Sequence, residues 1–270
     1  MSAEAIFADD TPISMLAPGN CKTQTARLWT YARDERPWVA TRPRQPGIGS
    51  GDRKGQHRKD HLARFRGWMH ADGYAGFEDL YRSGTIREVA CMAHVRRKFV
   101  DIHRSQGSPI AEDAIAGIAQ LYAVEKEARG SPPDVRVELR KAHAAPVFDD
   151  LEVWLALQLT TVSGKSPLAA AIRYALTRME RLRPYLDNGI LELDNNATER
   201  GMSAIALGRK NYLFVGFEAG GKAAAIAYTL IEPAKLNTVD PNAWLADTIA
   251  RVPDYKITKV DDLLRWCWKR

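Results

Sequence analysis

Three acidic residues lie far apart along the chain, and each adjoins a segment that can bring it into a shared site. Asp9 lies within an apolar segment, Asp72 ends the string GWMHAD, and Glu199 follows the string DNN. Carboxylate oxygens are the ligands that hard divalent cations prefer. Two Mg²⁺ ions about 4 Å apart activate a water or a 3′-hydroxyl and stabilise the leaving oxygen of a phosphodiester. The three acids are therefore candidates for a two-metal site, in which Mn²⁺ could substitute for Mg²⁺.

Each acid also has a local structural interpretation, which the spacing alone leaves open. Asp9 or Asp10 can begin a turn, and Asp72 can be the turn acid ahead of a glycine. Glu199 stands three residues after Asn196, which is the N3 position of a helix-capping arrangement.

Hydrophobic periodicity predicts an α/β chain with a helical insert. We expect strands at 5–16, 26–32, 67–72, 86–95, 190–193 and 211–215. We expect helices at 73–84, at 110–187 with breaks at 130–133 and 163–167, at 194–207, at 221–237 and in the tail 241–270. The three acids would then come from two strands and the start of one helix.

Residues 37–51, with the sequence PWVATRPRQPGIGSG, contain three prolines and three glycines. Proline removes a ladder donor and glycine weakens a strand. We therefore expect an irregular loop here rather than a strand.

The string from Gly216 to Lys222 has the spacing of a phosphate-binding P-loop, G-x-x-x-x-G-K. Position 223 is alanine, so the hydroxyl that should hold Mg²⁺ is missing, and Glu218 would face the phosphates. A nucleotide-binding P-loop is a weak alternative. Backbone N–H groups at 220–222 could still bind one DNA phosphate at a helix N-terminus.

Cys91 and His94, with His103 downstream, have a spacing compatible with zinc. One cysteine and two histidines do not complete a tetrahedral structural site. We therefore expect Cys91 to be a small buried apolar side chain.

The chain has 270 residues, 39 of them Lys or Arg and 33 Asp or Glu, which gives a net charge of +6. Residues 22–66 carry 12 basic and four acidic side chains. No apolar run approaches the roughly 18 residues of a membrane span. The first 12 residues carry three acids and no basic residue, unlike a signal peptide. Three cysteines argue against a disulfide framework, and together these features predict a cytoplasmic protein.

Basic side chains also cluster near the elements that are expected to carry the acids. Such residues suit a polyanionic substrate, although surface solubility explains them equally well. The candidate DNA-binding residues are Arg96, Arg97, Arg200, Arg209, Lys210 and Lys222.

Several strings together resemble one family, the insertion-sequence-sixty-six transposases, which are DDE-type enzymes with a ribonuclease-H-like core. The strings that carry the resemblance are ADDTP, RLWTYARDERPW, DRKGQH, HLARFRG, ADGYAGF, CMAHVRRKF, SPLAAAIRYAL, LDNNATERGMSAIALGRKNYLFVG and LIEPAKLN. The resemblance implies a mixed sheet flanked by helices, with an all-α insertion between the second and third acids. It implies Asp9, Asp72 and Glu199 as catalytic metal ligands, with Asp10 and Asp34 as alternatives for the first acid.

The resemblance also implies a domain plan. Residues 1–105 would form the first part of the core, 106–188 the helical insertion, 189–238 the last part of the core and 239–270 a helical tail. Its expected activity is metal-dependent strand cleavage and strand transfer on transposon ends and target DNA, within a homo-oligomeric complex.

The chain departs from the family pattern in two ways. It begins almost at the first catalytic strand, without the usual N-terminal DNA-binding regions, and residues 39–51 do not match the expected third strand. A pair of compensating frameshifts would produce such a segment. An inactive remnant that binds nucleic acid non-specifically is therefore the main alternative.

Overall fold

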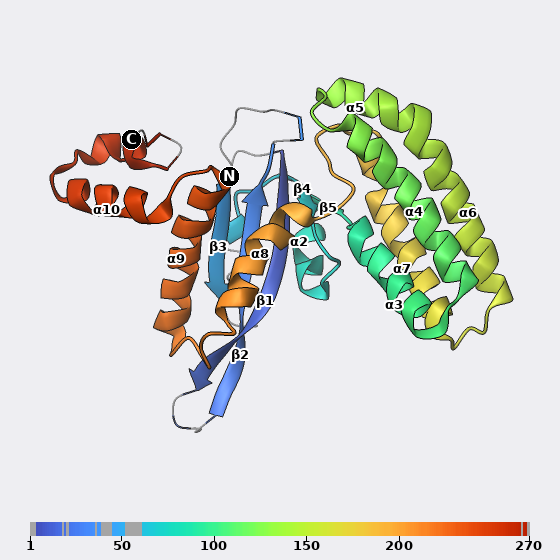
Figure 1. The fold of residues 1–270 in the computed structure, drawn as a ribbon, viewed down its shortest axis with the longest axis horizontal. Helices are drawn as coiled ribbons and strands as arrows, with labels where there is room; N and C mark the ends of the chain where they lie inside the picture. The colour runs from blue at the N-terminus through green and yellow to red at the C-terminus, as the bar shows by residue number, and fades with distance from the viewer. Residues whose placement is uncertain are drawn as a thin grey trace. The chain divides into compact units, whose positions relative to one another are not determined.

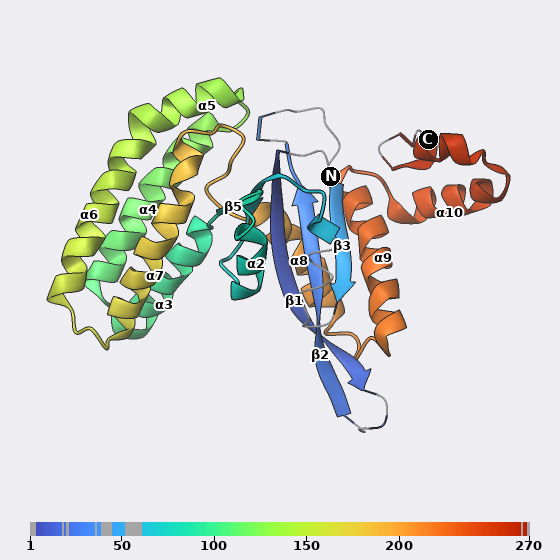
Figure 2. The ribbon, with the colours of Figure 1, turned by 180° about the vertical axis from the view of Figure 1, so that it is seen from behind.

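The computed structural model describes residues 4–17, 19, 22–35, 37–38, 45–51, 61–265 and 267–268 (Figures 1 and 2). The chain divides into two compact units. The first unit comprises Met1–Ala8, Glu35–Thr41 and Phe65–Asn196. The second comprises Asp9–Asp34, Arg42–Arg64 and Ala197–Arg270.

The described elements make a mixed α/β chain, as predicted. The strands are β1 (Ala5–Ala17), β2 (Lys22–Arg33), β3 (Gln45–Gly51), β4 (Gly67–His70) and β5 (Ile86–Val89). The helices are α2 (Glu78–Tyr81), α3 (Met92–Gln106), α4 (Pro109–Ala128), α5 (Pro133–Leu139), α6 (Ala145–Thr161), α7 (Pro167–Leu182), α8 (Asn196–Gly208), α9 (Glu218–Leu236) and α10 (Pro241–Arg251). A π-helical turn, Arg140–Ala144, joins α5 to α6, and 3₁₀ turns span Ala75–Phe77, Arg183–Leu186, Val252–Asp254 and Ile257–Leu263.

The strands of the first unit run parallel, in the order β1-β4-β5. The register pairs Phe7 with His70 and His70 with Val89. The predicted strand 86–95 is shorter than expected, because β5 ends at Val89 and α3 already begins at Met92.

In the second unit the order is β3-β2-β1, and β3 lies antiparallel to β2. The ladder runs without a break from Arg27↔Gly51 to Arg33↔Gln45. The predicted irregular loop at 37–51 is therefore wrong over 45–51, while residues 39–44 lie outside the described residues. The strand is possible because β3 is at an edge of the sheet, where proline costs least. A third strand is thus present where the family pattern expects one.

Two predicted strands, 190–193 and 211–215, are absent from the described structure. In 190–193 the backbone bonds to side chains and to the first residue of α3: the carbonyl of Leu191 accepts from Arg140, the amide of Glu192 donates to His70, and the carbonyl of Leu193 accepts from the amide of Met92. In 211–215 the side chain of Leu213 is 87% exposed, while Tyr212 and Val215 pack against the core of the second unit. Only the end of this segment pairs with β1, where the amide of Val215 donates to the carbonyl of Ser14.

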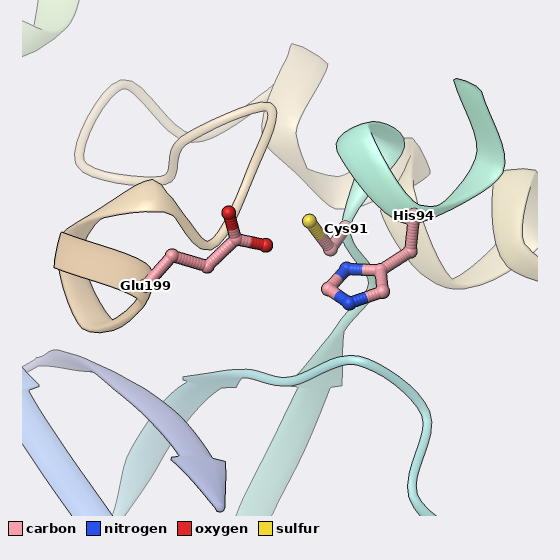
Figure 3. A group of neighbouring side chains, drawn as sticks. All are labelled: Cys91, His94 and Glu199. Carbon is pink, nitrogen blue, oxygen red and sulfur yellow. The ribbon is translucent and has the colours of Figure 1, made fainter. Parts of the chain in front are cut away.

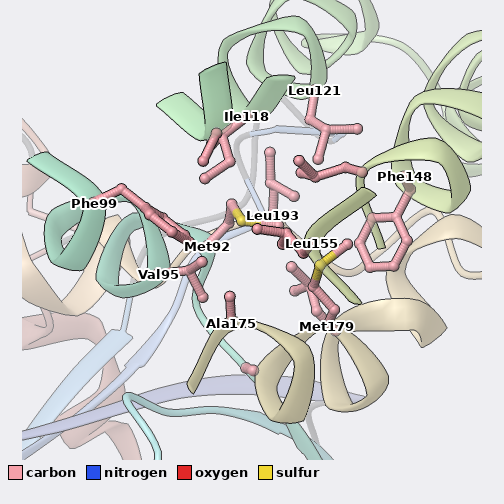
Figure 4. Close-up of a cluster of buried hydrophobic side chains, with 14 of the residues drawn as sticks. Met92, Val95, Phe99, Ile118, Leu121, Phe148, Leu155, Ala175, Met179 and Leu193 are labelled. Carbon is pink, nitrogen blue, oxygen red and sulfur yellow. The ribbon is translucent and has the colours of Figure 1, made fainter. Parts of the chain in front are cut away.

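Helices α3, α4, α6 and α7 pack around the core of the first unit (Figure 4). The predicted breaks between helices are correct, and serines begin two of these helices. Ser108 accepts from the amide of Ala111, and Ser166 accepts from the amide of Ala169. The side chains drawn at the centre of Figure 4 include Met92, Val95, Phe99, Ile118, Leu121, Phe148, Leu155, Ala175, Met179 and Leu193.

The second unit has its own apolar core, where α8 and α9 meet β1 and β2. Its buried members are Ile13, Met15, Ala26, Leu28, Met202, Ile205 and Ala225. Helix α9 also packs against β3. Among the described helices of both units, none is long and apolar enough to cross a membrane.

Candidate active site

Asp72 stands just beyond the carboxyl end of β4, in a tight turn. Its carboxylate accepts from the amide of Tyr74 at 3.0 Å, and its carbonyl accepts from the hydroxyl of Tyr174 at 3.3 Å. The turn role expected for this acid is therefore real. A second carboxylate oxygen remains for another ligand, so the turn role does not exclude metal binding.

Gly73 is required beside Asp72 for two reasons. Its φ of +80° lies in the left-handed region, and an added Cβ would meet the guanidinium of Arg178 at 2.2 Å. Arg178 donates to the carbonyl of Gly73 and pairs with Glu88 on β5. The backbone that carries Asp72 is thus fixed from α7.

Asp9 lies on β1, on the face that meets α8. Ile13 and Met15 of β1 pack with Met202 and Ile205 of α8. Because side chains alternate along a strand, Asp9 shares the face of Ile13 and Met15. Its carboxylate accepts from the amide of the next residue at 2.8 Å.

Asp10 lies on the opposite face of β1, where it forms an ion pair with Arg27 of β2. The Asp10 side chain is only 4% exposed, so this pair fills a structural role. Asp34, the other alternative, is buried immediately after β2. Position on the strand therefore favours Asp9 as the first acid.

Glu199 is the fourth residue of α8, and its carbonyl accepts from Ser203 at 2.9 Å. The capping arrangement predicted for Asn196 is wrong. Asn196 is itself helical, and its amide donates to the carboxylate of Asp194 at 3.0 Å. Glu199 therefore does not stand at the N3 position after an Asn196 cap.

Asn195 is a residue of the DNN string that the sequence analysis did not single out. It is fully buried in the first unit, and its side-chain amide donates to the carbonyl of Ala8 at 2.9 Å. Its backbone amide donates to the sulfur of Cys91 at 3.2 Å. Asn195 thus links the residue before Asp9 to the segment that leads into α8. Its place inside the string DNNATER was the available signal.

Buried charges hold the rest of that segment. Arg140 is fully buried and donates through Nε and Nη2 to both carboxylate oxygens of Glu125, each at 2.7 Å. It also donates to the carbonyls of Tyr185, Asn188 and Leu191. All five N–H groups of the guanidinium are therefore engaged.

His70 lies beside this network and is also fully buried. Burial, followed by the positive charges of Arg140 and Arg136, lowers the pKa of His70 to about 3. The neutral ring accepts from the amide of Glu192 at 3.3 Å and stacks on Phe7 at 4.5 Å between centroids. The segment before α8 therefore rests on a neutral histidine and buried arginines.

The basic candidates occupy different settings. Arg209 donates to Thr11 and to the carbonyl of Pro12, so it ties the end of α8 to β1. Lys222 pairs with Glu218 at 2.8 Å, and Lys210 is exposed. Arg96 and Arg97 are exposed on α3, and the backbone of Arg200 lies in α8. Their role in DNA binding stays a prediction.

The P-loop alternative is wrong. Helix α9 begins at Glu218, so residues 220–222 are helical, and the amide of Gly221 donates to the carbonyl of Phe217. An added Cβ on Gly220 would meet the carbonyl oxygen of Val215 at 1.8 Å. The glycine therefore serves close backbone packing rather than phosphate binding.

A zinc site of Cys91, His94 and His103 is also excluded. Cys91 precedes α3 and His94 lies in its first turn (Figure 3), whereas His103 lies nine residues beyond His94 on the same helix. A helical rise of 1.5 Å per residue separates the two histidines by about 13 Å. Cys91 is 2% exposed, as predicted for a small buried side chain. Glu199, also drawn in Figure 3, belongs to the second unit.

The fold and these residues define a mixed α/β protein that bears acids at the end of β4, on β1 and at the start of α8. The chain belongs to the transposase IS66 family: that family's model matches residues 1–223, and the model of the IS66 C-terminal element matches residues 229–266.

Curated relatives come from Sinorhizobium fredii (strain NBRC 101917 / NGR234). "Uncharacterized protein y4qI" is 40% identical over 98% of this chain and 51% of its own length. "Uncharacterized protein y4jD" is 38% identical over 99% of this chain and 54% of its own length. The chain thus spans about half the length of the curated relatives it matches.

Proposed function

We propose that this chain is the catalytic part of a DDE transposase, which cleaves DNA at transposon ends and transfers the freed strand to target DNA. Asp9, Asp72 and Glu199 are the proposed catalytic residues and the proposed ligands of two Mg²⁺ ions. Membership of the transposase family supports the reaction class. Three carboxylates form an oxygen donor set that suits a hard cation such as Mg²⁺.

The observation that carries the proposal is the register of β1 and β4. Phe7 pairs with His70 in a parallel ladder, and each of the proposed acids follows its partner by the same two residues. Asp9 and Asp72 thus each lie two residues past the last pair of the parallel β1–β4 ladder, Asp9 within β1 and Asp72 beyond the carboxyl end of β4. Such positions are common for binding and catalysis in parallel sheets. The third acid, Glu199, stands on the helix that packs on the Asp9 face of β1.

We also propose a ribonuclease-H-like core. The mixed sheet, with parallel β1, β4 and β5 and an antiparallel β2–β3 pair, supports this fold. Helices α4 to α7 lie between Asp72 and Glu199 in the chain, where the family resemblance expects a helical insertion.

The proposed chemistry assigns separate roles to the acidic and the basic side chains. The bound Mg²⁺ ions would activate the attacking oxygen and stabilise the departing one. Water attacks the phosphorus and the 3′-oxygen leaves as a hydroxyl, which then attacks a target phosphodiester and displaces another 3′-oxygen. Arg96, Arg97, Arg200, Arg209, Lys210 and Lys222 are candidates to bind phosphates, and a homo-oligomer would hold the two transposon ends.

The test is Mg²⁺- or Mn²⁺-dependent nicking of DNA that carries the ends of the element. Asp72→Asn should lower nicking at least 100-fold, because the amide is a poor metal ligand although its oxygen can still accept from Tyr74. Asp79→Asn is the matched control, since Asp79 is exposed and forms an ion pair with Arg82 three residues further along the chain. Nicking that survives in Asp72→Asn would refute the assignment. A wild-type chain without metal-dependent nicking would favour the inactive remnant.

Asn195 provides a test of positioning. Asn195→Asp keeps the size of the side chain but removes the donor to the carbonyl of Ala8. We expect the rate constant for nicking of bound DNA to fall about tenfold, with DNA affinity unchanged, because a displaced group near the reacting atoms slows the reaction. Fluorescence anisotropy gives the affinity and single-turnover nicking gives the rate. An equal loss of affinity and rate, or none in either, would contradict a positioning role.

A further inference from the structure

A cavity of about 510 Å³ opens between α3 and α4 in the first unit. Arg96, Arg97 and Val100 line it from α3, and Ala119 and Tyr122 line it from α4. The residues of α3 recur at helical spacing, so one face of that helix forms a wall. Asn196, the first residue of α8, also lines it.

The lining combines two kinds of chemistry. Arg96 and Arg97 are exposed residues, and guanidinium groups bind phosphate oxygens. Val100, Ala119 and the half-buried ring of Tyr122 offer apolar contact, and an aromatic ring can stack with any base. The volume lies within the range of small-ligand sites and is far too small for a duplex.

The pocket is also connected to the segment that leads to Glu199. Burial, followed by the charge of Asp194, raises the pKa of Tyr122, so its hydroxyl stays protonated and bonds to that carboxylate. Asp194 also accepts from the amide of Asn196. A ligand against Tyr122 and Asn196 would therefore lie against the start of the helix that carries the third proposed acid.

We propose that this pocket takes one unstacked nucleotide of a DNA strand, with its phosphate on Arg96 and Arg97 and its base against Tyr122. This inference rests on the proposed function and names a substrate feature for it: an unpaired nucleotide near the cleaved bond. A nucleotide has both the anionic group and the flat apolar surface that the lining offers.

The experiment compares a fully paired labelled duplex with the same duplex containing one unpaired 2-aminopurine. We expect the full chain to prefer the unpaired probe about tenfold by fluorescence anisotropy. The fluorescence of the 2-aminopurine reports whether its base is bound. Arg97→Ala and Tyr122→Leu should each reduce the preference to within about twofold. Tyr122→Phe keeps the ring and should retain most of it.

Arg104→Ala is the matched control for charge, because Arg104 is exposed on the same helix, α3, outside the pocket lining. This variant should keep the preference for the unpaired probe while lowering the affinity for both probes equally. The proposal is overturned if the wild-type chain shows no preference, or if Arg104→Ala abolishes the preference as Arg97→Ala does.

The proposed function fails separately from the pocket. Asp72→Asn should retain the preference for the unpaired probe, because Asp72 does not line the cavity. A preference for the unpaired probe without any metal-dependent nicking would support the pocket and refute the catalytic proposal. Nicking without the preference would support the catalytic proposal and refute the pocket.

Discussion

The two units hold the residues around α8 by different physical means. In the first unit, the segment 186–195 is fixed by buried charges and side-chain hydrogen bonds, chiefly those of Arg140 and Asn195. In the second unit, the body of α8 is fixed by apolar packing of Met202 and Ile205 on β1 and β2. The two means differ in how precisely they position a segment. Hydrogen bonds define one position, whereas apolar contact tolerates small shifts.

The charged network is costly to build and more costly to break. Moving an arginine and a glutamate out of water costs several kcal/mol for each ion, and the attraction between them offsets this only with good geometry. Arg140 has such geometry, with a bidentate contact to Glu125 and three carbonyl acceptors. A network of this kind adds little net stability but fixes where the chain enters α8.

The largest effect should therefore come from Arg140→Met, which preserves bulk and removes every donor. The Glu125 carboxylate would lose its bidentate contact and keep the pair with Arg136, and three carbonyls would lose the donor from Arg140. We expect the free energy of unfolding to fall by about 3–5 kcal/mol, as measured by urea denaturation.

Lys141→Met is the control at the next position. Lys141 is exposed and pairs with exposed Asp187 at 3.3 Å, so its loss should cost less than about 0.5 kcal/mol. If both variants lose the same stability, the contrast between a buried and a surface charge is refuted.

A smaller effect should appear in the pH dependence, through His70. The folded chain protonates this ring only near pH 3, whereas the unfolded chain does so near pH 6.5. The unfolded state therefore binds the proton first as pH falls, and the free energy of unfolding drops between pH 6.5 and pH 3. His70→Gln removes the ring. The slope of the free energy of unfolding against pH should then fall by the contribution of about one bound proton.

The measurement is urea denaturation at several values between about pH 7 and pH 4.5. The matched control is His143→Gln, which removes an exposed histidine on the π-helical turn. A steep dependence that persists in His70→Gln would assign the effect to another group.

The sequence predicted which elements carry the three candidate acids better than it predicted the scaffold around them. Asp9 and Asp72 could be placed because alternation and strand ends are local patterns, and the family resemblance selected these acids. The strand β3 could not be predicted, since its glycines and proline disfavour a strand and the partner β2 supplies the pairing. Arg136 and Arg140 resemble surface residues of a helix, and only the fold shows them buried. The roles of Asn195 and of the segment 190–193 likewise depend on side chains distant in sequence.

The smallest effect should come from the apolar packing of α8 in the second unit. Ile205 is fully buried in the core of the second unit, and Ile205→Val removes one methylene there. We expect a loss of about 1 kcal/mol, because the neighbouring side chains can partly close so small a gap. Leu207→Ala removes more carbon from an exposed site on the same helix and should cost less than about 0.5 kcal/mol.

Nicking per folded molecule should be unchanged in Ile205→Val, since a slightly looser apolar contact does not alter the hydrogen bonds that fix the entry to α8. A tenfold loss of nicking in that variant would show that apolar packing, and not the polar segment alone, sets the position of Glu199.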